Sequence, residues 1–371
     1  MVSTASIIVA FLAIGAGVLI SPIPKNLGLY TYIASKVPAL VGLTPAFHHG
    51  IEWNYTFDKL YNTCTDIQGQ NALITGANSG VGYETAKALA KCGVHVTMVC
   101  RNPKKCDAAA EIIREASADN GYENAVTTMT ADTSKLASVQ KFAKEFLSMY
   151  NEEDKALDML YLNAGIGGNS SNENRLSEDG IELVFATNYV GHHLMYRLLE
   201  PLLLKSKMAR VVQTSSSASF NTFGWKVATS LEQLNEFDWW KSNTDFRFYG
   251  QSKLAQIIWA KHLTKRLGTN SNIYVNAAHP GAVDTPIWKN ENIERYERII
   301  TYFRKNKMWT AEEGALTQIY LGAAVKEIKD KDIRGKYFHP QVQEMVNPLS
   351  LDEKIQEDLW TFSDELVAKY L

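Results

Sequence analysis

Short apolar runs alternate with helical stretches along most of the chain after residue 66. The first run, Ala72–Thr75, leads into a glycine-rich turn, and Glu84–Ala90 after it consists mostly of good helix formers. Further apolar runs predict strands at Val94–Cys100, Leu157–Leu162, Val211–Thr214 and Ile273–Ala278. Continuous apolar runs separated by helices are typical of strands covered on both faces. The pattern predicts an α/β fold with a doubly wound parallel sheet and helices on both faces.

Two polar positions mark predicted helix starts. Asn102 precedes Pro103, which combines a capping side chain with proline at the first helical position. Asp132–Thr133 precedes the next helical pattern and is predicted to cap it. We find no internal repeat or linker, so we expect one folded domain over residues 66–345 and a helical tail over residues 346–371.

The N-terminal segment departs from this pattern. Met1–Ile20 contains no charged residue, and every residue from Ile7 to Ile20 is apolar or glycine. Twenty helical residues span roughly 30 Å, enough to cross a bilayer core. We therefore predict a hydrophobic membrane anchor over residues 1–21 and a membrane-proximal segment over residues 22–65. A cleaved signal peptide would usually begin with basic residues, which are absent here; a hairpin formed with the apolar stretch Leu27–Phe47 remains an alternative.

The charges after the anchor predict its orientation. Lys25 and Lys36 lie on its C-terminal side and no charge precedes it, which favours a cytosolic location for the rest of the chain. We expect the membrane to be that of the endoplasmic reticulum or a lipid droplet. Asn54–Thr56 and Asn169–Ser171 match glycosylation sites, which would be used only in a lumen.

Composition narrows the function classes. With 46% hydrophobic and 21% charged residues, the 371-residue chain has ordinary globular usage, which argues against disorder. The formal net charge of -2 and the lack of a dense basic run argue against nucleic acid as a partner. The histidine pairs 192–193 and 48–49 lack metal-site spacing, so we expect no metal. The four cysteines form no CxxC motif, and we expect reduced thiols.

The turn after the first predicted strand, Thr75–Gly82, has the sequence TGANSGVG. Glycines there permit a tight turn and a close approach of the backbone to a pyrophosphate, which the free N–H groups of the following helix would bind. This strand, turn and helix predict a Rossmann-type dinucleotide site. At the end of the second strand, Cys100–Asn102 contains no carboxylate for a ribose hydroxyl, whereas Arg101 can pair with a 2′-phosphate. We therefore expect NADP(H).

Tyr249 and Lys253 are spaced to share one face of a helix. A phenol of ordinary pKa is a poor proton carrier at neutral pH, and a neighbouring ammonium is expected to lower that pKa. Seventeen tyrosines would produce about one such spacing by chance, and Tyr32 and Tyr83 also have a lysine four residues later. Only Tyr249 lies downstream of a series of further motifs, which are described next.

Those motifs are the glycine turn, Asn163–Gly165, the strand ending in Ser215–Ser217, the Tyr249–Lys253 pair and His279–Gly281. Together, over residues 70–345, they resemble the short-chain dehydrogenase/reductase family, and within it the retinol dehydrogenases and WW-domain-containing oxidoreductases. The resemblance implies catalytic roles for four residues: Asn188, Ser216, Tyr249 and Lys253. Ser216 would polarise the substrate oxygen, with Ser215 or Ser217 as alternatives, and Asn188 would support a water relay near the lysine.

The resemblance also implies a set of cofactor contacts. The adenosine side would be lined by the segment from Asn163 through Ala164 to Gly165, with Asp132 and Thr133 at the adenine. Pro280, Gly281, Val283 and Thr285 would close over the nicotinamide. The remaining predicted contacts come from the glycine turn, the second strand end and the catalytic pair: Gly76, Asn78, Ser79, Gly80, Val81, Gly82, Arg101, Asn102, Tyr249 and Lys253.

Two variable stretches, Ala218–Phe248 and Ile287–Trp309, are rich in large apolar residues. With a membrane anchor they favour a lipophilic substrate: a retinoid, sterol, polyprenoid or fatty aldehyde. A competing hypothesis is a catalytically silent nucleotide-binding membrane scaffold or redox sensor. The family resemblance also implies a possible homodimer formed through the helix that bears Tyr249.

Overall fold

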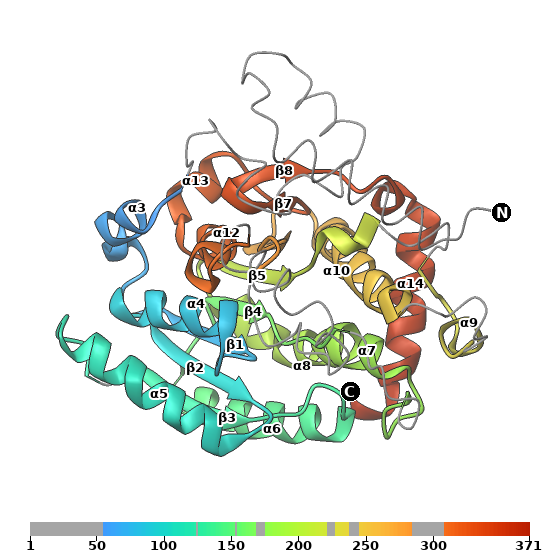
Figure 1. Ribbon diagram of the computed structural model, residues 1–371, viewed down its shortest axis with the longest axis horizontal. Helices are drawn as coiled ribbons and strands as arrows, with labels where there is room; N and C mark the ends of the chain where they lie inside the picture. The colour runs from blue at the N-terminus through green and yellow to red at the C-terminus, as the bar shows by residue number, and fades with distance from the viewer. Residues whose placement is uncertain are drawn as a thin grey trace, which may run out of the picture.

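The computed structural model describes residues 55–123, 125–152, 154–167, 175–220, 227–236, 245–283 and 308–371. In these residues eight strands form one sheet in the order β3-β2-β1-β4-β5-β6-β7-β8 (Figure 1). Every pair from β3 to β7 is parallel, and β8 runs antiparallel to β7. The strands are β1 Asn71–Thr75, β2 His95–Cys100, β3 Val126–Thr130, β4 Met159–Leu162, β5 Ala209–Thr214, β6 Ile273–Ala278, β7 Tyr337–His339 and β8 Gln343–Met345. The predicted Rossmann-type parallel sheet is confirmed.

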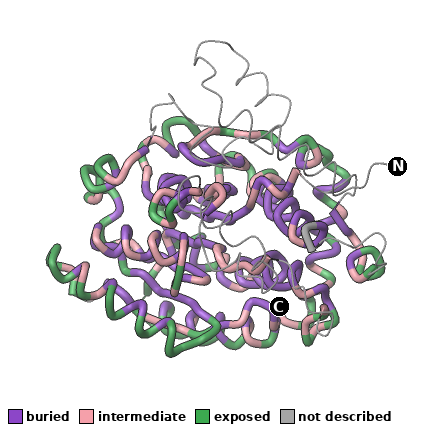
Figure 2. The backbone as a smooth tube through the Cα atoms, in the orientation of Figure 1, coloured by how far each residue is buried: buried purple, intermediate pink, exposed green. Residues whose placement is uncertain are grey.

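Helices cover both faces of this sheet. One hydrophobic core contains side chains of α4 (Gly80–Lys91), α5 (Pro103–Ala118) and α12 (Ala311–Ala323). The other contains side chains of α6 (Leu136–Glu152), α8 (Gly191–Lys205) and α10 (Asp245–Leu267). Successive β1 residues alternate between the two cores because side chains in a strand point to opposite faces: Ala72 and Ile74 enter one and Leu73 the other. Figure 2 shows the buried positions gathered along the strands and the inward sides of the helices.

The remaining α-helices of the described residues lie around this framework. They are α3 Phe57–Asn62, α7 Leu183–Phe185, α9 Leu231–Leu234, α13 Val325–Asp330 and α14 Glu353–Val367. Helix α14, in the predicted C-terminal tail, packs against α10 and places Leu359 and Trp360 in the same core as α6 and α8. A homodimer through α10 stays a prediction, and part of that helix is already covered by α14.

One of the two predicted helix caps is confirmed. The Asn102 side chain accepts a hydrogen bond from the backbone N–H of Lys105, and α5 begins at Pro103. The predicted cap at Asp132–Thr133 is wrong, because α6 begins only at Leu136. The carboxylate of Asp179 accepts from the Leu136 N–H at 3.0 Å, whereas Asp132 accepts from Ser134 within the preceding turn. The capping carboxylate thus comes from a distant part of the sequence.

The expectation of reduced cysteines is also wrong. Disulfides join Cys64 to Cys92 and Cys100 to Cys106, and no free cysteine remains in the described residues. The fold brings the Cα atoms of the two pairs to 4.9 and 5.9 Å, within the range for a disulfide. Cys64 lies in a short 3-10 helix (η3, Cys64–Asp66) and Cys92 directly follows α4. Folding, and not sequence spacing, creates this first pair.

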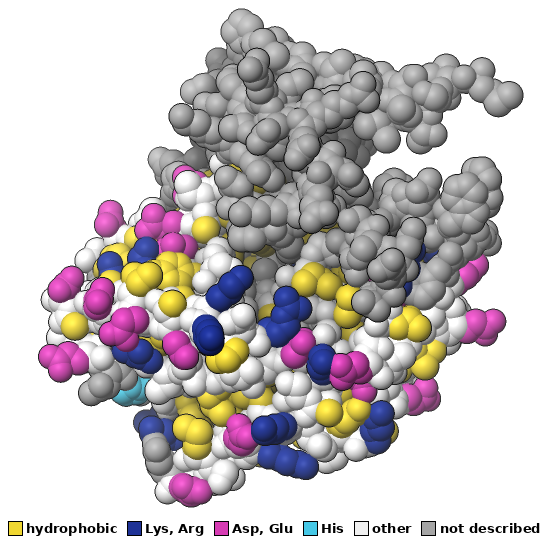
Figure 3. Space-filling view, turned by 60° about the horizontal axis from the view of Figure 1, so that its bottom comes forward, with side chains coloured by type: hydrophobic (Ala, Val, Ile, Leu, Met, Phe, Trp, Pro, Cys, Tyr) yellow, Lys and Arg dark blue, Asp and Glu magenta, His cyan; other side chains and the backbone are white. Residues whose placement is uncertain are grey.

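The surface in Figure 3 carries acidic and basic side chains interspersed with hydrophobic ones. Among the described residues no helix is both long and apolar enough to cross a membrane. The predicted anchor, residues 1–21, lies outside the described residues, as does most of the membrane-proximal segment.

Candidate active site

The glycine turn links β1 to α4 at the carboxyl edge of the sheet. Gly76 and Gly80 have φ angles of +67° and +59°, which favour glycine. A side chain at Gly82 would lie 2.4 Å from the Asn163 amide nitrogen and 2.6 Å from the Gly76 oxygen. Helix α4 begins without a side-chain cap and has no acidic residue in its first turn. This cradle, with its uncapped N–H groups and helix dipole, fits a pyrophosphate.

Thr75 and Asn163 form the floor of the turn. The Thr75 hydroxyl oxygen accepts hydrogen bonds from the backbone N–H groups of Asn163 and Ala164, both at 2.9 Å. The Asn163 side chain donates back to the Thr75 carbonyl oxygen at 2.9 Å. The ends of β1 and β4 are therefore joined directly below the glycine turn, where predicted contacts Asn163 and Ala164 come together with Gly76.

The predicted ribose-reading loop follows β2. Arg101 and Asn102 are exposed, and so are Lys104 and Lys105 in the first turn of α5. Asp107, also on α5, accepts from the Thr128 hydroxyl at 2.6 Å. Basic side chains and a helix N-terminus thus dominate this loop, and the arrangement suits an anion.

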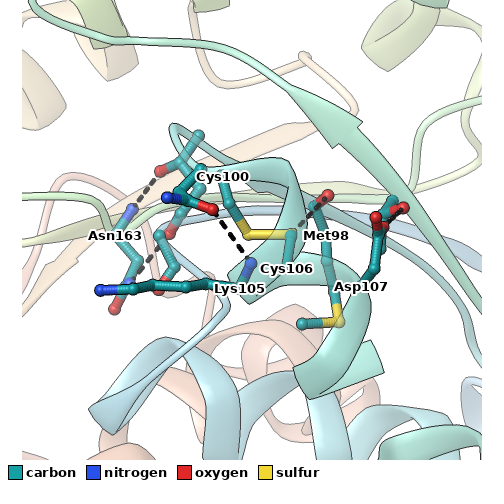
Figure 4. The surroundings of a disulfide bond; sticks show 10 residues. Met98, Cys100, Lys105, Cys106, Asp107 and Asn163 are labelled. Carbon is teal, nitrogen blue, oxygen red and sulfur yellow. Dashed lines mark hydrogen bonds between the residues drawn. A yellow bond between two sulfur atoms is a disulfide. The ribbon is translucent and has the colours of Figure 1, made fainter. Parts of the chain in front are cut away.

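A disulfide closes the same loop. Cys100 is the last residue of β2 and Cys106 lies in the first turn of α5, and a disulfide joins them (Figure 4). Arg101 and Asn102 lie between the two cysteines in the sequence. Both cysteines are buried. The cross-link restricts how far the start of α5 can move from the end of β2, and with it the backbone that presents Arg101.

Tyr249 and Lys253 lie one turn apart on α10, as predicted. The Tyr249 phenol lies close enough to the Ser216 side chain for that side chain to lower the pKa of the phenol. The Lys253 Nζ atom lies 5.5 Å from the centre of the Tyr249 ring and donates to the Thr214 carbonyl oxygen at 2.7 Å. The end of β5 therefore contacts both members of the pair.

The neighbouring serines Ser215, Ser216 and Ser217 differ in burial and in the groups that surround them. The Ser215 hydroxyl is buried and donates to the Lys253 carbonyl oxygen at 2.7 Å. Ser217 is buried at the start of a 3-10 turn (η5, Ser217–Phe220). Ser216 is partly exposed and is the serine whose side chain lowers the pKa of the Tyr249 phenol. This geometry favours Ser216 as the serine that would meet a substrate oxygen.

The expected effect of Lys253 on the Tyr249 pKa is not what the structure shows. Burial raises the pKa of Tyr249, and the Ser216 side chain offsets only part of that change. Burial also lowers the pKa of Lys253 to about 7. Removal from water disfavours the charged form of each group, so the pKa of Tyr249 rises while the pKa of Lys253 falls, and the two values move apart. The lysine, rather than the tyrosine, titrates near neutrality and can hold or release a proton beside the phenol.

Asn188 lies in a π-helical turn (η4, Ala186–Val190), a feature often found at functional sites. Its side chain accepts from the Ile166 N–H at 2.8 Å and donates to the Ile166 carbonyl oxygen and to the Ser252 hydroxyl. It thus fastens the segment after Gly165 to α10. A side chain at Gly165 would lie 3.5 Å from the Lys253 Nζ atom. The water relay through Asn188 stays a prediction.

The remaining predicted contacts fall into two groups. Asp132 lies in the turn before α6. The backbone of Thr133 packs closely on Gly191, and a side chain on Gly191 would lie 2.0 Å from the Thr133 carbonyl oxygen. Gly281 has a φ of +91°, and a side chain on it would lie 2.2 Å from the Trp309 ring. Val283 pairs with Trp309. Pro280 precedes this segment, and Thr285 lies outside the described residues.

Sequence reasoning missed several buried residues around the site. Trp309 holds the segment that contains Gly281 and Val283. Tyr337, on β7, lies behind Ser215 and Ser219, and burial raises its pKa, so it stays neutral. His192 contacts both Thr75 and Asn188. Of these, only His192 carried a signal: its place four residues after Asn188 in a helical pattern.

Comparison with known proteins identifies the family. Residues 70–229 match the family model described as short chain dehydrogenase. Mouse retinol dehydrogenase 14 is 32% identical over 314 residues, covering 81% of this chain and 87% of that protein. The chain belongs to the short-chain dehydrogenase family. Chicken WW domain-containing oxidoreductase is 31% identical and covers 82% of this chain and 70% of that protein.

Solved structures agree with this fold. An uncharacterised protein of Mycobacterium paratuberculosis has a TM-score of 0.58 at 26% identity, covering 82% of this chain and 97% of that one. A 3-ketoacyl-(acyl-carrier-protein) reductase of Brucella melitensis, solved with NADH, has a TM-score of 0.53 at 23% identity, covering 73% of this chain and 96% of that one. As a short-chain dehydrogenase, the chain is an oxidoreductase of CH–OH and C=O groups that uses a nicotinamide nucleotide.

The pKa of Lys253 predicts how activity depends on pH. Its ammonium form, which can supply a proton toward Tyr249, is present below about pH 7 and is lost above it. Carbonyl reduction should therefore fall as the pH rises through about 7, and alcohol oxidation should rise. The measurement is kcat against pH in both directions. Lys253→Arg keeps its charge across this range and should lose the inflection; an unchanged inflection in that variant would assign it to another group.

Proposed function

We propose that the chain is an NADP(H)-dependent oxidoreductase that interconverts a lipophilic alcohol and its carbonyl compound. The main support is the proximity of Ser216 to Tyr249, with Lys253 one turn away, at the same edge of the sheet as the glycine turn. Ligands of doubly wound sheets bind at this carboxyl edge. The nucleotide would supply or accept hydride, and the protein would place the substrate and handle the proton.

Each side chain has a separate task in this proposal. Ser216 orients the substrate oxygen by a hydrogen bond, and Tyr249 gives that oxygen a proton during reduction. Lys253 replaces the proton, which its pKa of about 7 allows at neutral pH. Asn188 holds the segment after Gly165 against α10 and so keeps the lysine in place.

The choice of NADP(H) rests on the loop after β2. Arg101 is exposed there, with Lys104 and Lys105 in the first turn of α5. A 2′-phosphate would meet a guanidinium and a helix N-terminus, whereas the loop Cys100–Asn102 has no carboxylate to accept from a 2′-hydroxyl.

The lipophilic substrate is supported by composition and by the relatives' names. Several relatives are named retinol dehydrogenases. Of the two apolar variable stretches, Ala218–Phe248 is described only in part, and Ile287–Trp309 lies almost entirely outside the described residues. A retinoid, sterol, polyprenoid or fatty aldehyde would match their composition.

One observation favours the silent redox-sensor alternative: the disulfide between Cys100 and Cys106 brackets Arg101. A nucleotide-binding sensor would not need the Tyr249 hydroxyl. The Tyr249→Phe variant, which removes only this hydroxyl, therefore distinguishes the enzyme hypothesis from the sensor hypothesis.

Removal of the Tyr249 hydroxyl should abolish turnover. Tyr249→Phe is expected to lower kcat for NADPH-dependent reduction by about 100- to 10,000-fold, the usual contribution of a general acid. Detergent-solubilised protein would be screened against retinal, a steroid ketone, a polyprenal and a long-chain aldehyde, following nicotinamide absorbance. Tyr83→Phe is the matched control, because Tyr83 also has a lysine four residues later, at 5.9 Å from its ring centre. No turnover in the parent protein, with cellular function intact in Tyr249→Phe, would favour the sensor.

Arg101 should determine cofactor preference. Arg101→Ala is expected to weaken NADPH binding by about 10- to 100-fold, the effect of losing charge-assisted hydrogen bonds, and to leave NADH binding unchanged. Calorimetric titration of both nucleotides measures the difference. Lys326→Ala, which removes another exposed charge on α13, should change neither affinity. Equal affinity of the parent protein for NADPH and NADH would refute the assignment.

We further propose that residues 1–21 hold the protein at a membrane. Disulfides are more common in proteins of oxidising compartments, so the two found here favour a luminal location for the folded domain. This differs from the cytosolic location expected from Lys25 and Lys36. The protein should sediment with membranes after a carbonate wash, and deletion of residues 1–21 should release it. Alkylation in intact cells should find no free thiol. Four alkylated thiols would restore the cytosolic orientation, and a soluble full-length protein would exclude the anchor.

A further inference from the structure

Both ring nitrogens of the buried His192 have defined partners. Its Nδ1 atom lies 2.9 Å from the carbonyl oxygen of Asn188, and its Nε2 atom lies 2.9 Å from the Thr75 hydroxyl oxygen. A carbonyl oxygen can only accept, so Nδ1 must bear the proton and Nε2 must accept from the Thr75 hydroxyl. The surroundings therefore select one neutral tautomer.

The other contacts of Thr75 agree with this assignment. Its hydroxyl oxygen already accepts from two backbone N–H groups, those of Asn163 and Ala164. Its single hydrogen has two possible acceptors, His192 Nε2 at 2.9 Å and the Tyr161 carbonyl oxygen at 3.3 Å, and the imidazole is the nearer. Burial lowers the pKa of His192 to about 3, so the ring stays neutral at physiological pH.

At its other end the imidazole supports the π-helical turn. The Asn188 carbonyl oxygen also accepts from the Gln256 side chain of α10 at 2.8 Å. The Asn188 side chain in turn bonds to Ser252, which precedes Lys253. A continuous chain of hydrogen bonds therefore runs from the residue before the glycine turn to the helix that bears Tyr249 and Lys253.

The neighbouring His193 has different surroundings. Its Nδ1 atom accepts from the Trp259 indole N–H at 3.0 Å, and its Nε2 atom lies 2.8 Å from the Asp364 carboxylate on α14. It thus connects α8 to α10 and the C-terminal helix without contacting Thr75 or Asn188 in the described bonds. The two histidines share burial and position in α8, so His193 is a matched control for His192.

We propose that His192 is a positioning residue that couples the nucleotide-binding turn to the catalytic helix through the chain Thr75–His192–Asn188. One bond holds the floor of the pyrophosphate cradle and the other holds the turn that fixes α10. The proposal rests on the proposed function, because it assigns the two ends of the chain to cofactor binding and to proton transfer. His192 acts through its neighbours and touches neither nucleotide nor substrate.

Two conservative variants separate the two ends of the chain. His192→Asn retains an amide N–H near the position of Nδ1 and loses the acceptor for Thr75, so Kd for NADPH should rise by about threefold to tenfold, with kcat within twofold. His192→Gln retains an acceptor near the position of Nε2 and loses the bond to Asn188, so kcat should fall by a similar factor with Kd unchanged. His192→Leu should lose both. Calorimetry gives Kd for NADPH, and turnover of the best carbonyl in the screen gives kcat.

The outcomes distinguish positioning from simple packing. His193→Asn should lower the melting temperature without separating Kd from kcat. If the Asn and Gln variants of His192 change Kd and kcat in parallel, or change neither, the proposal is overturned; they decide it even if His192→Leu does not fold. If the parent protein binds NADPH but reduces no carbonyl, the proposed function fails, whereas weaker NADPH binding by His192→Asn and unchanged binding by His192→Gln would still support the link to the cradle.

Discussion

The hydroxyl group of Thr75 joins the two halves of the sheet at the point where strand order reverses. β1 lies between β2 and β4, and the next strand in sequence on each side continues outward from there. At this position one side chain accepts from the first two residues after β4 and contacts His192 of α8. The crevice of a doubly wound sheet opens at such a reversal. Because Gly76 follows directly, any shift of Thr75 would be passed to the turn that faces the pyrophosphate.

The second constraint is the burial of the reactive groups. Lys253 is almost fully buried, and its pKa falls from 10.5 in a model peptide to about 7. Between these two pH values the unfolded chain binds a proton that the folded protein does not, so the folded state loses stability as the pH falls through this range. At neutral pH the cost is on the order of 4 kcal/mol, offset in part by the bond to Thr214. Sites suited to catalysis commonly reduce stability in this way.

The sequence predicted most features that depend on neighbouring residues. The apolar runs correspond to β1, β2, β4, β5 and β6, the glycine turn lies where the alternation placed it, and Asn102 caps α5. Features that depend on distant partners were missed. Asp179 caps α6 from 43 residues away, and the disulfide joins Cys64 to Cys92 across 28 residues that include β1 and α4. The pKa directions of Tyr249 and Lys253 were missed for the same reason, because spacing along a helix does not report burial.

The position of α14 has a consequence for how the protein is made. Its Leu359, Phe362 and Val367 complete the hydrophobic core that also contains α6, α8 and α10. During synthesis these residues leave the ribosome after all the strands of the sheet. That face of the nascent chain must therefore remain uncovered until late in translation. Until then, a chaperone or a membrane surface could cover its exposed hydrophobic side chains.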